Sequence, residues 1–211
     1  MPPRSRRSYD QFCSAARALD AVGDRWTLLI VRELLVGPRR YTDLHADLPG
    51  VSTDVLASRL KDMEQSGLAT RRRLPPPASA YVYELTERGR ALLPVLRALA
   101  AWGAPELAER RPTDAVRAHW FALPLLDAVA PEEGLLEVRL EEGDFHVWIR
   151  GGGEVSYGDG AAPGEPDARM VLDAGTAVEV SRGVLSVADG VRGGRIAVVG
   201  ESALAKALRE G

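Results

Sequence analysis

Glycine and proline residues divide the first 80 residues into short segments, and the positions of these breaks limit which folds the chain can adopt. Breaks at positions 23, 37–38, 49–50 and 67 separate stretches in which apolar residues recur at helical spacing. After position 67 the period changes, because two runs rich in Thr, Val and Tyr flank the proline-rich segment 75–79. The pattern of breaks therefore predicts four short helices followed by a β-hairpin.

The predicted helices span residues 8–22, 24–36, 42–48 and 52–66, with strands at 68–74 and 80–86 and a last helix at 86–102. Ser52 or Thr53 caps the fourth helix, which is expected to bury Val55, Leu56, Leu60 and Met63. Pro94 is expected to bend the last helix. This order is that of a winged helix-turn-helix, with helix 52–66 suited to the DNA major groove and wing 68–86 to the backbone.

Charge is divided unevenly along the 211 residues, although the net charge is only −3. Residues 1–112 hold 18 Lys and Arg against 13 Asp and Glu, a net of +5, and residues 113–211 hold 9 against 17, a net of −8. A basic half can neutralise phosphates, whereas an acidic half is repelled by them. The asymmetry predicts two domains, 1–112 and 113–211, with different partners.

Several classes of protein are disfavoured by what the sequence lacks. No run of 18 apolar residues suggests a transmembrane helix, and the basic N-terminus lacks a signal-like apolar stretch, so a cytoplasmic location without membrane contact is expected. Cys13 is the single cysteine, which excludes an intrachain disulfide and a multi-cysteine metal site. His119 and His146 have no partner at ligand spacing, and no catalytic set is present. We therefore expect no metal, no cofactor and no enzymatic activity.

Ordered motifs along residues 9–103 point to a known family. They are Arg25-Trp26, Gly37-Pro38-Arg39, Pro49-Gly50, Leu85-Thr86 with Gly89, and Trp102-Gly103. They lie within CSAARALDAVGDRWTLLIVRELLVGPRRYTDLHADLPGVSTDVLASRLKDMEQSGL and YVYELTERGRALLPVLRALAAWG. Here the chain closely resembles the HxlR family of bacterial transcription regulators. The resemblance implies a homodimer, joined through the first and last helices of this domain, that binds a double-stranded DNA operator.

The candidate DNA-contacting residues lie on the outward face of helix 52–66, on the first wing strand and at the end of the second helix. They are Arg39, Arg40, Ser52, Thr53, Asp54, Ala57, Ser58, Arg59, Lys61, Arg71, Arg72 and Arg73. Arg59 is the least clear of these, because its stem would lie at the edge of the core. The alternative for the three consecutive arginines is a solvated charged strand. Ala80 stands where many relatives have a basic wing-tip residue, so the arginines at the base of the wing would supply the backbone contacts.

Cys13 has two interpretations. Several members of the family that this chain resembles use a cysteine at this place to sense oxidants or electrophiles, and Arg17, four residues on, would favour the thiolate. Alternatively, Cys13 is a small buried residue on the dimer helix, and the chain has no second cysteine to resolve a sulfenic acid.

The second half predicts a small α+β domain in which helices cover an antiparallel sheet. Helices are expected at 115–130, 175–183, 186–194 and 202–210, and strands at 135–142, 144–151, 167–173 and 195–200. The glycine-rich segment 150–160 is read as a turn.

The motifs WIRGGGEV, DARMVLDAGTAVEVSRG and LSVADGVRGGRIAVVGESALAKAL resemble the sterol-carrier-protein type domain, over about residues 114–210. The resemblance implies an apolar tunnel for a small hydrophobic ligand. Its candidate lining residues are Trp120, Phe121, Phe145, Val147, Met170, Val180 and Leu185. Each of these side chains would equally be expected in a packed core that holds no ligand.

The sequence thus predicts a dimeric DNA-binding transcription regulator whose C-terminal domain binds a hydrophobic effector. Two other hypotheses remain: a redox sensor that acts through Cys13, and a hydrophobic-ligand carrier or enzyme that uses the winged helix as a scaffold.

Overall fold

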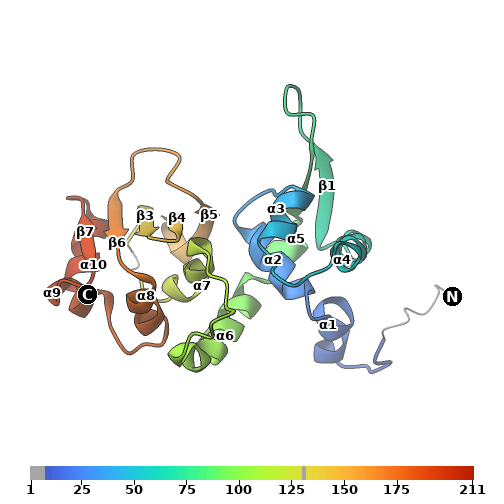
Figure 1. Ribbon diagram of the computed structural model, residues 1–211, viewed down its shortest axis with the longest axis horizontal. Coiled ribbons are helices and arrows are strands. Elements are labelled where there is room, and N and C mark those ends of the chain that lie inside the picture. Colours follow the sequence, from blue (N-terminus) through green and yellow to red (C-terminus); the bar gives the residue numbers. More distant parts are fainter. Residues whose placement is uncertain (1–7, 130–131) are drawn as a thin grey trace. The chain divides into compact units, whose positions relative to one another are not determined.

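The computed structural model describes residues 8–129 and 132–211, which form two compact units that divide between Leu92 and Leu93 (Figure 1). The fold class is α+β. The division differs from the predicted domain boundary after residue 112, because α6 (Leu93–Gly103) packs against α7 (Ala122–Leu125). The basic residues among 1–7 lie outside the described part. Among the described residues, no helix is both long and apolar enough to cross a bilayer.

The first unit has the order of elements that its glycines and prolines predict. It contains α1 (Ser14–Val22), α2 (Thr27–Leu35), α3 (Tyr41–Ala46), α4 (Thr53–Gln65), β1 (Ala69–Arg73), β2 (Tyr81–Leu85) and α5 (Glu87–Arg90). Its core is formed by the apolar faces of α2, α3 and α4, and the fully buried residues include Ile30, Leu34, Leu44, Leu56, Leu60 and Met63. Gly50 (φ 84°) and Gly67 (φ 68°) turn the chain before and after α4 in the left-handed region that favours glycine.

The first helix is shorter than predicted, since α1 begins at Ser14 and the segment before it folds back along the helix. Ser8 Oγ donates to Asp20 Oδ2 at 3.2 Å, and the Tyr9 backbone N–H donates to Asp20 Oδ1 at 2.8 Å. These side-chain bonds satisfy polar groups that a longer helix would have paired within itself.

The predicted single helix at 86–102 is two helices, α5 and α6, separated by a turn at residues 91–92. Pro94 is the second residue of α6 rather than an interior residue of one bent helix. A proline lacks the N–H group that a helix interior needs, but it is tolerated in the first turn, where that group has no partner.

The second unit is built around a five-stranded sheet with order β5-β4-β3-β6-β7. The strands are β3 (Gly134–Leu140), β4 (Gly143–Arg150), β5 (Glu154–Asp159), β6 (Ala168–Val171) and β7 (Ala197–Val199). The helices are α6, η1 (Ala104–Ala108), η2 (Ala118–Phe121), α7, η3 (Gly151–Gly153), α8 (Ala174–Ser181), α9 (Val187–Arg192) and α10 (Ala203–Glu210).

Three predictions for this unit were wrong. The sheet is mixed, because β3 and β6 pair in parallel. The segment read as a turn contains β5, which pairs with β4, and the loop that follows arches over β4 and β3 to reach β6 (Figure 1). The helix predicted at 115–130 is reduced to η2 and α7, because Pro124 has no N–H to bond back to Trp120.

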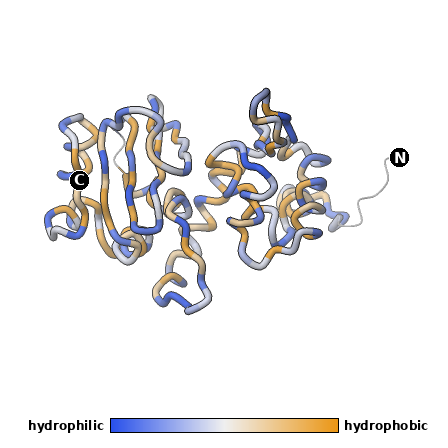
Figure 2. The backbone as a smooth tube through the Cα atoms, turned by 45° about the horizontal axis from the view of Figure 1, so that its top comes forward, coloured by the Kyte–Doolittle hydropathy of each residue, from blue (hydrophilic) through white to orange (hydrophobic). Residues whose placement is uncertain are grey.

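One face of the sheet is apolar, as the alternating pattern predicts. Strand register places Val138 beside Phe145 and Met170, and all three are fully buried. Figure 2 shows the alternation of hydrophobic and hydrophilic residues along these strands. Helix α7 packs against β4, and α10 packs against β6 and β7.

The other face of the sheet carries a buried carboxylate. Glu137 accepts hydrogen bonds from Arg169 Nε at 2.6 Å, Arg139 Nε at 2.8 Å and the Ala162 backbone N–H at 2.9 Å. These donors, Arg169 first, lower the pKa of Glu137 to about 2. The loop between β5 and β6 is thereby held on the sheet.

Candidate nucleic-acid interface

Helix α4 is fixed at its N-terminus by two side chains. Ser52 is its N-cap and accepts a hydrogen bond from the Val55 N–H at 3.4 Å. The Tyr41 hydroxyl, on α3, donates to the Thr53 carbonyl oxygen at 2.7 Å. The first turn of α4 is therefore tied to the preceding helix of the helix-turn-helix.

The outward face of α4 is solvent-exposed as the sequence predicts. The exposed residues are Ser52, Thr53, Asp54, Ala57, Ser58 and Lys61. Val55 was expected in the core, but it is 39% exposed. The spacing of Leu56, Leu60 and Met63 leaves it at the side of the buried stripe rather than within it.

Arg59 differs from the other candidates because its guanidinium is buried and paired. Its side chain is 7% exposed, and it contacts the carboxylates of Asp24 and Asp62 at 3.0 Å each. Its Nη2 also donates to Ser58 Oγ at 3.3 Å. These partners occupy the guanidinium, so the structure gives Arg59 a role in joining α4 to the segment before α2.

The three arginines of β1 divide between the two faces of the hairpin. Arg71 lies opposite Tyr83 and Arg73 opposite Tyr81, so Arg71 and Arg73 share one face and Arg72 is on the other. Arg71 lies over the Tyr81 ring, 4.0 Å from its centroid. Arg73 is exposed and has no hydrogen-bond or ion-pair partner among the described residues.

Arg72 is paired within the hairpin. Its Nε and Nη2 donate to the two carboxylate oxygens of Glu84, each at 3.1 Å. This pairing raises the pKa of Arg72, so the guanidinium remains charged but shares its charge with the carboxylate. On the opposite face, burial raises the pKa of Tyr83, whose ring therefore stays uncharged beside Arg71.

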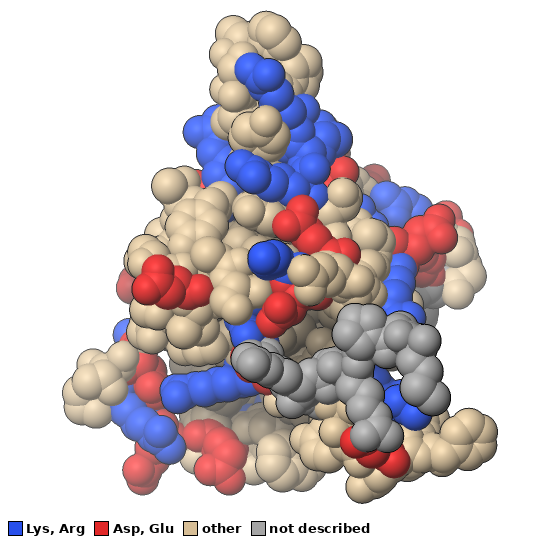
Figure 3. Space-filling view, turned by 90° about the vertical axis from the view of Figure 1, so that its right-hand side faces the viewer, with Lys and Arg blue, Asp and Glu red and all other residues tan. Residues whose placement is uncertain are grey.

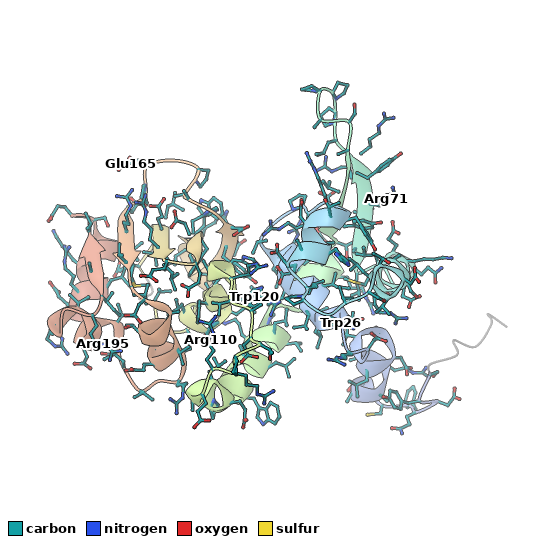
Figure 4. The ribbon with its side chains drawn as sticks, in the orientation of Figure 1. Trp26, Arg71, Arg110, Trp120, Glu165 and Arg195 are labelled. Carbon is teal, nitrogen blue, oxygen red and sulfur yellow. The ribbon has the colours of Figure 1, made fainter. Side chains whose placement is uncertain are left out.

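Arg39 and Arg40 lie at the base of the hairpin. The Arg39 backbone exchanges two hydrogen bonds with Tyr83, at 2.9 and 2.8 Å, and so extends the hairpin by one bridge. The Arg40 N–H donates to Asp43 Oδ2, while its side chain is exposed. Figure 3 shows Lys and Arg gathered on the hairpin, and Figure 4 shows Arg71 projecting from it.

Sequence reasoning missed a hollow beside α4. It is open to solvent, has a volume of about 420 Å³, and is lined by Arg25, Trp26 and Val55, among others. The Arg25 guanidinium lies 5.3 Å from the centre of the Trp26 ring, which Figure 4 shows at the start of α2. The Arg-Trp pair was noted as a family motif, but only the fold brings it next to α4.

The candidate ligand residues of the second unit fall into two groups. Phe145, Val147, Met170 and Val180 are buried between the sheet and its helices. Trp120, Phe121 and Leu185 are half-buried. None of the seven lines the hollow beside α4, and none lines a second hollow, which is bounded by Arg139, Val171 and Asp173, among others.

Cys13 is exposed and immediately precedes α1. The backbone N–H groups of Ala16 and Ala15 lower the pKa of its thiol. Large apolar side chains are also exposed on or beside the two helices for which the family resemblance implies dimer contacts. These are Tyr9, Phe12 and Leu19 at α1, and Val95, Leu99 and Trp102 on α6.

Comparisons with known proteins concern the helix-turn-helix part of the chain. The HxlR-like helix-turn-helix family matches residues 21–111. The HTH-type transcriptional regulator YvaP of Bacillus subtilis is 38% identical over 86 residues, which cover 41% of this chain and 80% of YvaP. The HTH-type transcriptional regulator YodB of the same organism is 38% identical over 85 residues, covering 40% of this chain and 76% of YodB.

Among solved structures, the reduced form of YodB is 34% identical, with a TM-score of 0.41, and covers 49% of this chain and 100% of that chain. The quinone-bound form of YodB is 33% identical, with a TM-score of 0.38, and covers 43% and 96%. At 38% identity over more than two thirds of YvaP and of YodB, the chain belongs, through its helix-turn-helix part, to the HxlR-like family.

Proposed function

We propose that this protein is a cytoplasmic, homodimeric transcription regulator that binds a specific double-stranded DNA operator and has no enzymatic activity. Helix α4 enters the major groove, and the wing at residues 68–86 lies on the backbone. One observation carries the proposal: α4 presents a continuous exposed face of small and polar residues, next to a hairpin whose arginines are exposed. Such a helix fits the groove, and the arginines supply phosphate contacts.

The dimer is supported by exposed apolar side chains. Phe12 beside α1 and Trp102 on α6 are both largely exposed, although large aromatic residues are usually buried. A second copy that covers them would remove this apolar area from water. Two copies of α4 would then read half-sites about 34–36 Å apart, or a multiple of that distance.

The test is selection of bound sequences from random DNA, followed by binding measurements on the recovered operator. Ser58→Ala and Lys61→Ala should relax base preference at defined operator positions, whereas Arg73→Ala should weaken binding to all sequences alike. If no sequence is enriched, or if Ser58→Ala and Lys61→Ala leave the binding motif unchanged, this assignment of α4 is wrong.

We also propose that the second unit is a sterol-carrier-type domain that binds a small hydrophobic effector. Its apolar sheet face, covered by helices, supports this proposal. An effector would have to part the buried side chains. Because it would bind only the folded state, ligand binding should raise the melting temperature. Hydrophobic compounds that stabilise the protein should change operator affinity by about 5–150-fold. Stabilisation without a change in operator affinity would instead favour a carrier.

A redox-sensing regulator is a second candidate, because Cys13 is exposed and its thiol pKa is lowered. Solved structures of the relative YodB include a quinone-bound form and a diamide-treated form. Mild oxidant or quinone should modify Cys13 and reduce operator binding, and Cys13→Ser should keep binding under the same treatment. If the wild type and this variant respond alike, the redox candidate fails.

A further inference from the structure

The hollow beside α4 has an apolar wall on the helix that the proposed function places in DNA. Val55 projects from the first turn of α4, and Trp26 lies just before α2. Asp54 and Ser58, which also line the hollow, belong to the exposed face of α4. A duplex that contacts this face would therefore present its base edges to the hollow.

The exposure of Val55 is not explained by the stability of α4. A β-branched side chain lowers helix propensity, and at 39% exposure Val55 leaves much of its apolar surface in water. The core stripe of the helix is already complete without it, since Leu56, Leu60 and Met63 are buried. The exposed part of its methyl groups is therefore available for an apolar contact outside this chain.

The hollow lies between two elements that side-chain contacts join to each other. Arg59 on α4 pairs with Asp24 at 3.0 Å, which holds the start of α2 against the helix. Asp24 also accepts a hydrogen bond from the Trp26 N–H at 3.3 Å. The Arg25 guanidinium lies over the Trp26 ring and limits its movement. Val55 and Trp26 are thus held on elements that are fixed to each other.

We propose that Val55 and Trp26 form a subsite for the 5-methyl group of a thymine in the operator. Thymine is the only one of the four DNA bases that presents a methyl group in the major groove, and apolar side chains contact it there. The inference rests on the proposed function, since it requires α4 to lie in the groove. It adds a specificity-determining residue, Val55, that the sequence placed in the core.

The test exchanges single thymines for deoxyuridine, which removes only the methyl group and keeps base pairing. Each thymine of the operator recovered by selection is replaced in turn, symmetrically in both half-sites, and affinity is measured for full-length wild type and for Val55→Ala. Wild type should lose about fourfold in affinity per half-site at one position, as expected for one methyl group removed from an apolar contact. The Val55→Ala variant should bind the thymine and deoxyuridine operators about equally well.

Val184→Ala is the matched control, because Val184 is also an exposed valine but lies in the second unit. It should keep the wild-type sensitivity to deoxyuridine. Val55→Thr, which keeps the shape of the side chain, should show a reduced sensitivity and guards against misfolding of the alanine variant.

An operator with no deoxyuridine-sensitive position would overturn the inference but leave the proposed function standing. The same conclusion follows if Val55→Ala keeps the full wild-type sensitivity. If wild type enriches no operator at all, the proposed function fails, and the inference fails with it.

Discussion

Arg72 and Arg73 are adjacent and chemically identical, yet the hairpin predicts opposite behaviour for them in DNA binding. Arg73 has no partner in the described part of the chain, whereas Arg72 is held by both carboxylate oxygens of Glu84 at 3.1 Å. We therefore expect Arg73→Ala to remove a phosphate contact and Arg72→Ala to remove very little. Glu84→Gln releases Arg72 on the face away from Arg73, so it should add no phosphate contact.

The size of the effect follows from counterion release. Each phosphate contact contributes about 0.9 to the slope of log affinity against log salt, so a dimer that loses two contacts should lose about 1.8. Between 50 and 200 mM salt, a fourfold change, wild-type affinity should then fall about 12-fold more than that of Arg73→Ala. Glu84→Gln should leave the slope close to that of the wild type, because Arg72 lies on the opposite face of the hairpin.

The assay is fluorescence anisotropy with a labelled operator at several salt concentrations. Folding is not expected to confound it, because an exposed ion pair such as Arg72–Glu84 is worth about 0–1 kcal/mol, and thermal melts will check this. Equal losses of slope for Arg72→Ala and Arg73→Ala would refute the division of the hairpin into two faces. An unchanged slope for Arg73→Ala would refute the placement of the wing on the backbone.

Three further predictions concern stability. Because the folded-state pKa of Glu137 is lowered to about 2, its stabilisation is present above pH 4.5 and is lost as the pH falls toward 2. Urea unfolding should show a loss of about 3 kcal/mol in the free energy of unfolding over this window, and the loss should be absent in Glu137→Gln. Gly89→Ala should destabilise the protein by about 2 kcal/mol in thermal melts, because the added Cβ would lie 2.1 Å from the Leu68 carbonyl oxygen. Gly103→Ala is the control and should leave the stability unchanged, since its Cβ would have no atom within 4 Å. Arg59→Met should lower the free energy of unfolding by about 2 kcal/mol. The loss is smaller than for a fully buried ion pair, because the two carboxylate partners of Arg59 are partly exposed. An unchanged melting temperature would contradict this account.

Local patterns in the sequence determined the order of the elements in the first unit. The positions of the breaks could be predicted, because glycine and proline end helices. They stand at residues 23, 37–38, 49–50 and 67. The cap at Ser52 and the alternation along the β1 arginines depend only on neighbours in sequence, and both could be predicted. The outward residues of α4 could be predicted for the same reason, except Val55, which is exposed, and Arg59, which is buried.

Contacts between residues far apart in sequence decided the rest. Arg59 was a candidate DNA contact until the fold placed Asp24, 35 residues earlier, at its guanidinium. Alternation along the strand separates Arg72 from Arg73, but only the register of the hairpin brings Arg72 within reach of Glu84.

In the second unit, too, local patterns could be predicted from the sequence and long-range contacts could not. Alternation predicted the apolar face that holds Phe145, because side-chain direction in a strand repeats every two residues. It could not predict that β6 pairs in parallel with β3, nor that Glu137 is buried under the loop that makes this crossover. Sequence fixes the direction of a side chain relative to its own element, whereas only the packed structure decides which distant group it meets.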